Sequence, residues 1–296
     1  MTYEICSTID SDYINVSLVF AKSFSKHNPE LKLNIYCINF SNKKYKEYAN
    51  KLNPFKNVIP ISVTFTDPVD RIDTGEYIDC HVYQRHMHAT IYKLKLFSEM
   101  TTDYMLYLDV DMLIRKDITP LLQEYTTDFV GREYQLPPND RGINAGVLIA
   151  RKGMTNLYKD SFDFFEKRKK NPLPEEYYIF HSGHSITNLP ARYNYFRYKN
   201  CLELVSDPSI VHFCSTSKPF TKSESLDPDY IRRLYEAAAT GNYIFFEEWY
   251  DIFDSVKEIL DSAFVNRTNE IRQFYKQYIN ISKRQLTKFK RLTKWK

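Results

Sequence analysis

Short apolar runs rich in β-forming residues alternate with amphipathic segments through the first third of the chain, and this rhythm limits the fold more than any other feature. Residues 12–27 and 82–100 carry apolar side chains at helical spacing. The β-rich runs around them are Glu4 to Thr8, Lys32 to Cys37, Val58 to Val63 and Tyr104 to Leu108. This alternation predicts an α/β fold with a mostly parallel central sheet flanked by helices.

Later segments extend this pattern. Gly146 to Ala150 is typical of a further strand, after a polar loop that contains Pro137 and Pro138. Ile210 to Phe213 is predicted to be a late strand of the same sheet, and residues 228–264 are predicted to be helical. The 296 residues contain no internal repeat and no linker that forces a division. We therefore expect one domain over residues 1–264, followed by a C-terminal tail over residues 265–296.

The tail holds the basic character of the chain. After Glu270 there is no acidic residue, whereas nine Lys and Arg residues lie between Arg272 and Lys296. The net charge is +4, so without these nine charges residues 1–270 carry about −5. Aromatic and aliphatic residues accompany the basic ones in 272–296, a mixture suited to an anionic membrane surface. A solvated helix is the alternative, and the acidic body gives little support to nucleic acid as a partner.

Cysteine usage and hydropathy bear on the compartment. The apolar runs are far shorter than the ~20 residues of a membrane-spanning helix. Five cysteines are scattered along the chain without close-paired spacing, namely Cys6, Cys37, Cys80, Cys201 and Cys214. Their odd number and spacing argue against a disulfide framework and against a zinc site. We therefore expect a cytoplasmic protein that is at most peripheral on the inner face of the membrane.

The strand over residues 104–108 ends abruptly at Asp109-Val110-Asp111. In extended backbone, side chains two residues apart share a face, so the two carboxylates converge while Val110 points the other way. Ligands of open α/β sheets bind beyond the carboxyl ends of the strands. Because hard divalent cations prefer oxygen ligands, the pair predicts a metal site. A solvated turn with two acidic caps is the alternative.

Four stretches together resemble glycosyltransferase family 8, in order from Glu4 to about Phe220. They are CSTIDSDY at 6–13, TIYKLKLF at 90–97, INAGVLIA at 143–150 and HFCSTSKPF at 212–220. The resemblance implies a GT-A fold, with a Rossmann-like, mostly parallel sheet, flanking helices and a helical C-terminal region. It also implies that residues 1–264 are a catalytic domain that binds a UDP-sugar.

The first two stretches gain implied roles in donor binding. Thr8, Asp10 and Tyr13 would hold the uracil and the ribose, although Asp10 or Asp12 also suits the cap of the next helix. Lys93 would face the donor, although taken alone it is typical of a solvated helix lysine.

The third and fourth stretches would complete the site. Asn144, Ala145 and Gly146 would line the donor-sugar pocket, where a glycine lets backbone approach a ligand. The fourth stretch has the spacing of the family's His-x-x-Gly-x-x-Lys-Pro-Trp motif, with Ser in place of Gly and Phe in place of Trp. The match implies that Lys218 is catalytic and reaches the diphosphate, where a fixed cation stabilises the leaving group.

The same match implies that His212 is the third metal ligand beside Asp109 and Asp111, with the whole Asp109-Val110-Asp111 segment at the cofactor. Two carboxylates with one imidazole suit Mn²⁺ better than Mg²⁺, because imidazole is a softer ligand than Mg²⁺ prefers. We therefore expect Mn²⁺, with Mg²⁺ as the alternative.

Family members carry an Asp-Gln pair near the sugar carbon that the acceptor attacks, and this pair is not plainly present. Counting back from the matching RYN at 192–194 places Glu175 and Glu176 there as catalytic candidates, whereas other gaps place Gly183 and His184 there. Glu175 after a proline is equally typical of an acid at a helix N-terminus.

The resemblance implies transfer of a hexose, galactose or glucose first, from a UDP-sugar to a glycan or glycolipid acceptor with retention of configuration. Glu133 is a weaker candidate for contact with the sugar or the acceptor. A nucleotide-sugar-binding protein without transfer activity is one alternative. A metal-dependent hydrolase is another, because paired aspartates beside a histidine also build two-metal sites.

Overall fold

The chain forms two compact units, Met1–His212 and Phe213–Lys296. The computed structural model describes residues 1–67, 69, 72, 80–136, 140–167, 174–196, 205–213, 218–220, 243–273 and 275–276. Within this part, every named strand belongs to the first unit. The division expected between residues 264 and 265 stays a prediction.

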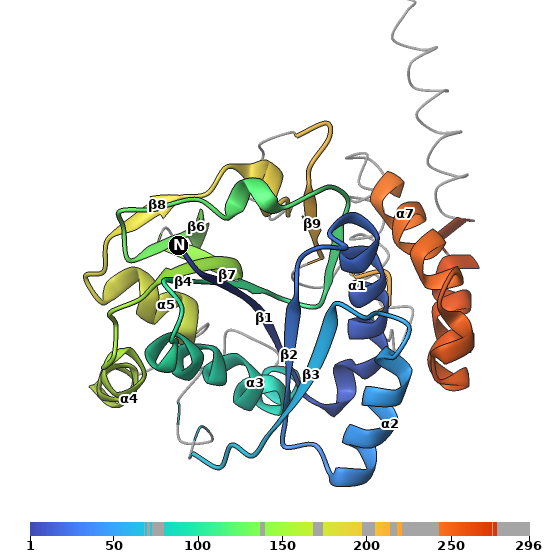
Figure 1. Ribbon diagram of the computed structural model, residues 1–296, viewed down its shortest axis with the longest axis horizontal. Coiled ribbons are helices and arrows are strands. Elements are labelled where there is room, and N and C mark those ends of the chain that lie inside the picture. Colours follow the sequence, from blue (N-terminus) through green and yellow to red (C-terminus); the bar gives the residue numbers. More distant parts are fainter. Residues whose placement is uncertain are drawn as a thin grey trace, which may run out of the picture. The chain divides into compact units, whose positions relative to one another are not determined.

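A seven-stranded sheet of order β3-β2-β1-β4-β7-β6-β8 forms the centre of the first unit (Figure 1). Its strands are β1 Tyr3–Ile9, β2 Leu33–Ile38, β3 Val58–Val63, β4 Tyr104–Leu108, β6 Phe129–Leu136, β7 Asp140–Arg151 and β8 Ile186–Asn188. The first four pair in parallel, β7 runs antiparallel to β4 and β6, and β8 runs parallel to β6. The predicted α/β fold and its four early strands are confirmed, each strand within one residue at either end.

Helices cover the sheet. They are α1 Ile14–His27, α2 Asn42–Leu52, α3 Cys80–Glu99, α4 Leu157–Lys167 and α5 Pro174–His181. Helices α3, α4 and α5 pack against one another and share one apolar core with the sheet. Met105 and Tyr107 of β4 lie in this core with Leu94 and Phe97 of α3, because alternate residues of a strand point to the same face. The helices predicted over 12–27 and 82–100 are thus confirmed.

A second, two-stranded antiparallel sheet joins β5, Met112–Ile114, to β9, Ile210–His212. The prediction that residues 210–213 enter the large sheet is therefore wrong. Strand β4 is already paired on both edges, with β1 and with β7, so no edge remains beside it. Instead the chain leaves the large sheet after β4, and β5 offers β9 a new edge. Along the chain, the segment from β5 to β9 also includes two short 3₁₀ turns, η3 Thr119–Leu121 and η4 Ala191–Tyr193.

The second unit contains α7, Tyr243–Asp254, and the 3₁₀ turn η5, Lys257–Ile259. Among the described residues of this unit the buried apolar side chains are largely aromatic. Trp249 stacks on Phe253 with ring centroids 5.6 Å apart. The helical prediction for 228–264 is confirmed over α7, whereas 228–242 and the Pro137–Pro138 loop lie outside the described residues. Among the helices that the structure describes, none has the length and hydropathy that crossing a bilayer requires.

Candidate metal centre

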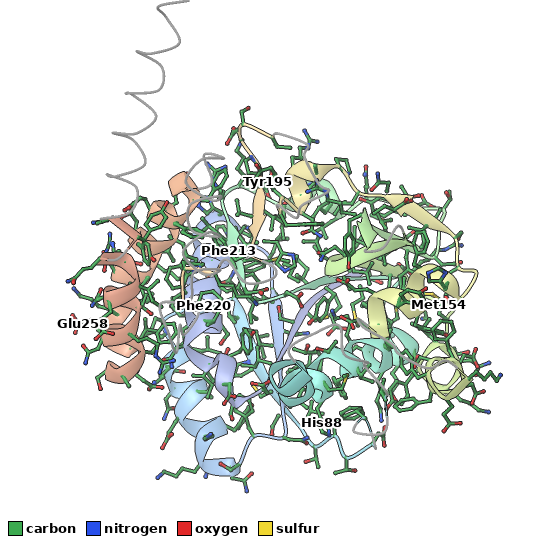
Figure 2. The ribbon with its side chains drawn as sticks, turned by 180° about the vertical axis from the view of Figure 1, so that it is seen from behind. His88, Met154, Tyr195, Phe213, Phe220 and Glu258 are labelled. Carbon is green, nitrogen blue, oxygen red and sulfur yellow. The ribbon has the colours of Figure 1, made fainter. Side chains whose placement is uncertain are left out.

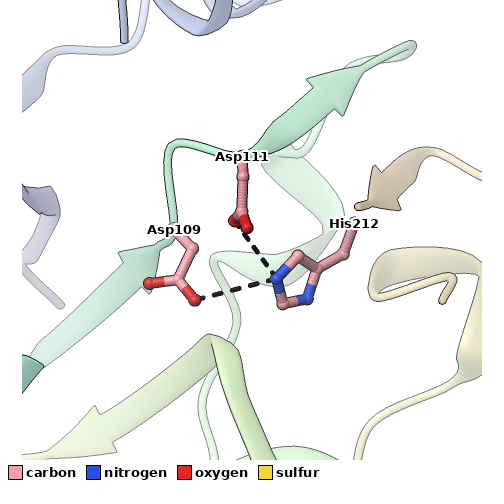
Figure 3. Close-up of side chains that lie close together, drawn as sticks. All are labelled: Asp109, Asp111 and His212. Atoms are coloured by element: carbon pink, nitrogen blue, oxygen red, sulfur yellow. Dashed lines mark ion pairs between the residues drawn. The ribbon is translucent and has the colours of Figure 1, made fainter. Parts of the chain in front are cut away.

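Strand β4 leads Asp109 and Asp111 out of the core. All five residues of β4 are buried, and the strand ends where the two aspartates flank Val110, which is 5% exposed. The backbone N–H of Asp109 donates to the Gly146 carbonyl of β7 at 2.8 Å, which holds the start of the turn. Figure 3 shows both carboxylates directed toward the same point, with Asp111 at the entry to β5.

The β5–β9 pair adds a histidine to the two aspartates. Met112, the residue after Asp111, is opposite His212 in the register. Nε2 of His212 lies 3.3 Å from Asp111 Oδ1 and 3.7 Å from Asp109 Oδ2, the two contacts dashed in Figure 3. One ligand atom from each of the three residues lies within 4.8 Å of the others. Tertiary structure therefore brings together the three residues that the sequence nominates as metal ligands.

This donor set fits a divalent cation. A six-coordinate ion with bonds of ~2.1 Å holds its ligand atoms ~3 to ~4 Å apart, and the distances from Nε2 to the two carboxylates fall in that range. The side chain of Asp109 is 32% exposed and that of His212 is 3% exposed. The Asp109 side of the group is therefore open to solvent, whereas the His212 ring is enclosed by protein. Within the described part of the chain, no other group of His, Cys, Asp and Glu meets this spacing.

The imidazole of His212 lies directly against the Cα atom of Gly146. A Cβ at position 146 would come within 2.2 Å of Cε1 and 2.6 Å of Nδ1, so any larger residue would displace the ring. The sequence predicts that Gly146 leaves room for the donor. The structure shows that it leaves room for the histidine, and its contact with a donor stays a prediction.

Lys93 of α3 lies beside the metal centre, and its side chain is 2% exposed. Its Nζ donates to the Ala145 carbonyl at 3.2 Å and lies 3.8 Å from Asp109 Oδ1 and 3.6 Å from Glu175 Oε1. Burial lowers the pKa of Lys93, but Asp109, Glu175 and Glu176 raise it, and the net pKa is raised. The alternative of a solvated helix lysine is therefore wrong.

Glu175 and Glu176 occupy the first turn of α5 and are 5% and 6% exposed. Glu176 Oε1 accepts from the Ala145 N–H at 2.9 Å and from Asn144 Nδ2 at 3.2 Å. Its Oε2 accepts from the Tyr134 hydroxyl. Burial and the charge of Glu175 raise the pKa of Glu176 to about 8, although the hydrogen bonds from Tyr134 and Ala145 lower it. Glu176 is thus joined directly to the segment that the sequence assigns to the donor sugar, whereas Glu175 is linked to it through Lys93.

The other candidates for these roles lie in different surroundings. Gly183 is in the turn after α5 with a φ of 82°, and His184 Nδ1 lies 3.7 Å from Asp128 Oδ2. Glu133 is in β6, where its backbone N–H donates to Asn188 Oδ1 at 3.1 Å. Gly183 and His184 stay alternatives for the family's Asp-Gln pair, and contact of Glu133 with the sugar or the acceptor stays a prediction.

The residues expected to hold uracil and ribose lie at the end of β1. The Thr8 hydroxyl donates to a carbonyl of α3 at 2.8 Å, and Asp10 accepts from the Asp12 N–H at 2.8 Å. Asp10 thereby caps η1, Ser11–Tyr13, which leads into α1. The contacts of Thr8, Asp10 and Tyr13 with a nucleotide stay predictions.

Two further residues complete the account of the site. Lys218 belongs to the second unit, where its Nζ lies 6.0 Å from the centre of the Phe220 ring, and its role stays a prediction. Asn194 has no role assigned from the sequence, yet it is 0% exposed and contacts Nδ1 of His212 at 3.2 Å. The signal available for it was its place in the matching stretch at 192–194.

Comparison with known proteins finds relatives along most of the chain. Residues 4–191 match glycosyl transferase family 8. The chain is 23% identical over 240 residues to glycosyltransferase GlyA of Streptococcus pneumoniae serotype 4 (strain ATCC BAA-334 / TIGR4). That match covers 70% of this chain and 31% of GlyA. The chain thus spans about a third of the length of this curated relative.

Solved structures share the fold. Galactosyltransferase LgtC, in complex with donor and acceptor sugar analogues, has a TM-score of 0.60 at 16% identity, covering 89% of this chain and 99% of LgtC. GlyE of Streptococcus pneumoniae TIGR4 has a TM-score of 0.57 at 17% identity, covering 93% of this chain and 64% of GlyE. The expected GT-A fold is confirmed. The family match covers residues 4–191, which is well over half of the chain, and the chain therefore belongs to glycosyltransferase family 8.

Proposed function

We propose that the chain is a metal-dependent glycosyltransferase that moves a hexose from a UDP-sugar to a glycan or glycolipid acceptor with retention of configuration. The observation that carries this proposal is the convergence of Asp109, Asp111 and His212 beyond the carboxyl end of β4, in a chain of family 8. Galactose and glucose are the first hexoses to test. The shared fold with a galactosyltransferase supports galactose.

Asp109, Asp111 and His212 are the residues that would hold the metal, Mn²⁺ first and Mg²⁺ second. A divalent cation there would supply positive charge beside the diphosphate, where negative charge grows as UDP leaves. Asp109 and Asp111 fit this task because their backbone is held at both ends, by the Gly146 carbonyl before the turn and by β5 after it.

The remaining residues of the site would bind and orient the donor. Lys93 holds the Ala145 carbonyl and balances the charge of Glu175, so it keeps the wall of the sugar pocket in place. Glu175 would lie near the carbon that the acceptor attacks. Lys218 would add a positive charge at the diphosphate. In a retaining transfer the acceptor hydroxyl approaches the same face that UDP leaves.

Release of UDP from a panel of UDP-sugars, with Mn²⁺ or with a chelator, tests the proposal without knowledge of the acceptor. We expect slow release that requires metal and favours one sugar. Metal-dependent binding without release would favour a nucleotide-sugar-binding protein. Absence of both binding and release would contradict the proposed function.

A lipid-linked acceptor at an anionic membrane is the second part of the proposal, and the nine basic residues of 272–296 support it. The first residues of this segment have structural contacts within the second unit. Arg272 Nη1 donates to Asp254 Oδ2 at 2.6 Å, and Tyr275 is 0% exposed. A truncation that tests membrane binding should therefore keep the chain through Lys276.

We expect the chain that ends at Lys276 to release UDP at the rate of the full chain but to bind anionic vesicles more weakly, because seven of the nine basic residues are removed. Co-sedimentation with vesicles of phosphatidylserine and phosphatidylcholine measures the binding, with pure phosphatidylcholine as the control. Equal binding of both chains to the anionic vesicles would contradict the membrane role.

A further inference from the structure

Two amide oxygens face the edge of His212 that points away from the aspartates. Nδ1 lies 3.1 Å from Asn144 Oδ1 and 3.2 Å from Asn194 Oδ1. An amide oxygen only accepts hydrogen bonds, so both contacts are favourable only when Nδ1 carries a hydrogen. In the neutral ring, that hydrogen leaves Nε2 with its lone pair, and Nε2 is the atom that faces Asp109 and Asp111.

The orientation of both amides is set by their nitrogen atoms. Asn194 Nδ2 donates to Asn144 Oδ1 at 2.8 Å, and Asn144 Nδ2 donates to Glu176 Oε1 at 3.2 Å. Turning over the amide of Asn144 would oppose two NH₂ groups and would set its oxygen against the oxygen of Glu176. The two amide oxygens are therefore held on the side of His212.

Glu176 closes this chain of hydrogen bonds with an acceptor. Its Oε1 accepts from Asn144 and also from the Ala145 N–H at 2.9 Å. Its Oε2 contacts the Tyr134 hydroxyl, so a proton on the carboxyl group has its place on Oε2 and leaves Oε1 an acceptor. Each hydrogen bond between His212 and Glu176 therefore keeps the same donor and the same acceptor whether the Glu176 carboxyl group is protonated or ionised. The chain is buried, since Asn194, Glu176 and Asn144 are 0%, 6% and 7% exposed.

Hydrogen bonds to the backbone of Asn194 and Tyr195 fix this segment beside β9. Arg132 Nη1 donates to the Asn194 carbonyl at 2.7 Å. The next residue is Tyr195, which is labelled in Figure 2. Its backbone carbonyl accepts from the His212 N–H at 2.8 Å, and its backbone N–H donates to the Ile210 carbonyl at 3.0 Å. The amide and the imidazole are therefore carried by segments that are bonded to each other.

We propose that Asn194 and Asn144, anchored by Glu176, are positioning residues that hold His212 as the Nδ1–H tautomer with its Nε2 lone pair directed at the metal centre. The inference rests on the proposed metal-binding role of His212. Histidine ligands in proteins generally donate their second ring N–H to an acceptor that sets tautomer and ring orientation. Here two neutral amides take that place, and Glu176 acts on the ligand rather than on the sugar.

Nitrogen-15 NMR of the metal-free protein tests the tautomer, and calorimetric titration with Mn²⁺ tests the consequence. We expect the neutral ring of His212, assigned by its loss in His212→Gln, to carry its hydrogen on Nδ1. Asn194→Leu removes an acceptor at similar volume, so the hydrogen should shift partly to Nε2 and the affinity for Mn²⁺ should fall roughly 10- to 100-fold. Asn194→Asp keeps an acceptor and should hold the tautomer and most of the affinity.

Asn57→Leu is the matched control, because the Asn57 amide donates to the carbonyls of Asn28 and Leu31 at 2.9 Å each. It should lower stability without changing the tautomer or the affinity. A wild-type ring with its hydrogen on Nε2 would overturn the inference even if Asn194→Leu fails to fold. A folded Asn194→Leu protein with unchanged tautomer and affinity would overturn it as well. An Nδ1–H ring in a protein that binds neither Mn²⁺ nor Mg²⁺ would instead refute the proposed function alone.

Discussion

Two groups of buried charge lie side by side in the first unit, and each combines two carboxylates with one nitrogen base. The candidate metal centre consists of Asp109, Asp111 and His212. The lysine cluster consists of Lys93, Glu175 and Glu176. Asp109 links the groups, since one of its oxygens lies 3.8 Å from Lys93 Nζ and the other lies 3.7 Å from His212 Nε2.

The two groups differ in where their positive charge comes from. Buried carboxylates are costly unless a cation compensates them. In the lysine cluster the cation is part of the chain, and the side chains of Lys93 and Glu175 are 2% and 7% exposed. In the metal centre Asp109 is 32% exposed, so an external ion can reach the carboxylates. The difference teaches that residue types alone do not distinguish a ligand site from an internal ion pair.

The largest expected effect is that of Asp111→Ala on the metal centre. It removes a ligand atom that lies 3.3 Å from His212 Nε2, so metal-dependent UDP binding and UDP release should be lost. The loss should exceed the roughly 10- to 100-fold typical of residues that only support a ligand. Calorimetry with Mn²⁺ and UDP measures it, with the surface change Asp117→Ala as the control. Normal metal-dependent turnover in Asp111→Ala would refute the proposed centre.

The next largest effect is expected for Lys93→Met, which removes the internal cation from the lysine cluster. Asp109 and Glu175 then lose their buried partner, and the free energy of unfolding should fall by about 3–5 kcal/mol. Urea denaturation measures this change. The control is Lys95→Met on the same helix, where Lys95 pairs at 3.9 Å with the exposed Glu99 and the loss should stay below about 1 kcal/mol. Equal losses in the two variants would remove the distinction drawn for Lys93.

Gly146→Ala tests whether the position of the His212 ring, and with it the affinity for metal, depends on the missing side chain at position 146. A Cβ within 2.2 Å of the imidazole must displace the ring, so stability should fall by about 1–3 kcal/mol and Mn²⁺ affinity should fall as well. Gly131→Ala is the matched control, because its Cβ would come within 2.5 Å of Ile143 instead. We expect the control to lose stability but to keep its Mn²⁺ affinity. Similar affinities in both variants would contradict the role assigned to Gly146.

The smallest change, taken per pH unit, is a pH dependence of stability that belongs to the lysine cluster. The pKa of Glu176 is raised from 4.5 to about 8 by burial and by Glu175, so the folded state binds more protons than the unfolded state between these pH values. Stability should therefore decrease as pH rises through this window, by up to about 1.4 kcal/mol per pH unit. Glu176→Gln should remove that slope in urea denaturation series. Parallel pH profiles of wild type and variant would contradict it.

Local patterns predicted much of the fold and part of the site. The strands β1 to β4 follow from short apolar runs, and so does the position of Asp109 and Asp111 directly after the end of β4. The two carboxylates point the same way, as the sequence predicts, but they do so across a bend at residues 110–111 and not within an extended strand. The order of strands does not follow from such patterns. Strand β9 was predicted in the large sheet but pairs with β5, because pairing depends on which edges remain open.

The supporting residues of the site are harder to predict. Lys93 has the sequence appearance of an exposed helix lysine but is 2% exposed, since the carboxylates that compensate it come from β4 and α5. Nothing in the local sequence around Asn194 predicts its contact with His212, because that contact depends on where the pairing of β9 places the histidine. Burial and partners at these positions depend on contacts between segments far apart in the chain.

By itself the sequence determined the alternation of strands and helices, the carboxylate pair at the end of β4 and the likeness to family 8, because these depend on spacing within short segments. Only the tertiary structure decided which carboxylates keep an internal cation, why position 146 requires glycine and which groups contact the imidazole of His212. These outcomes depend on burial and on hydrogen-bond direction between distant segments, and a linear pattern carries no record of either.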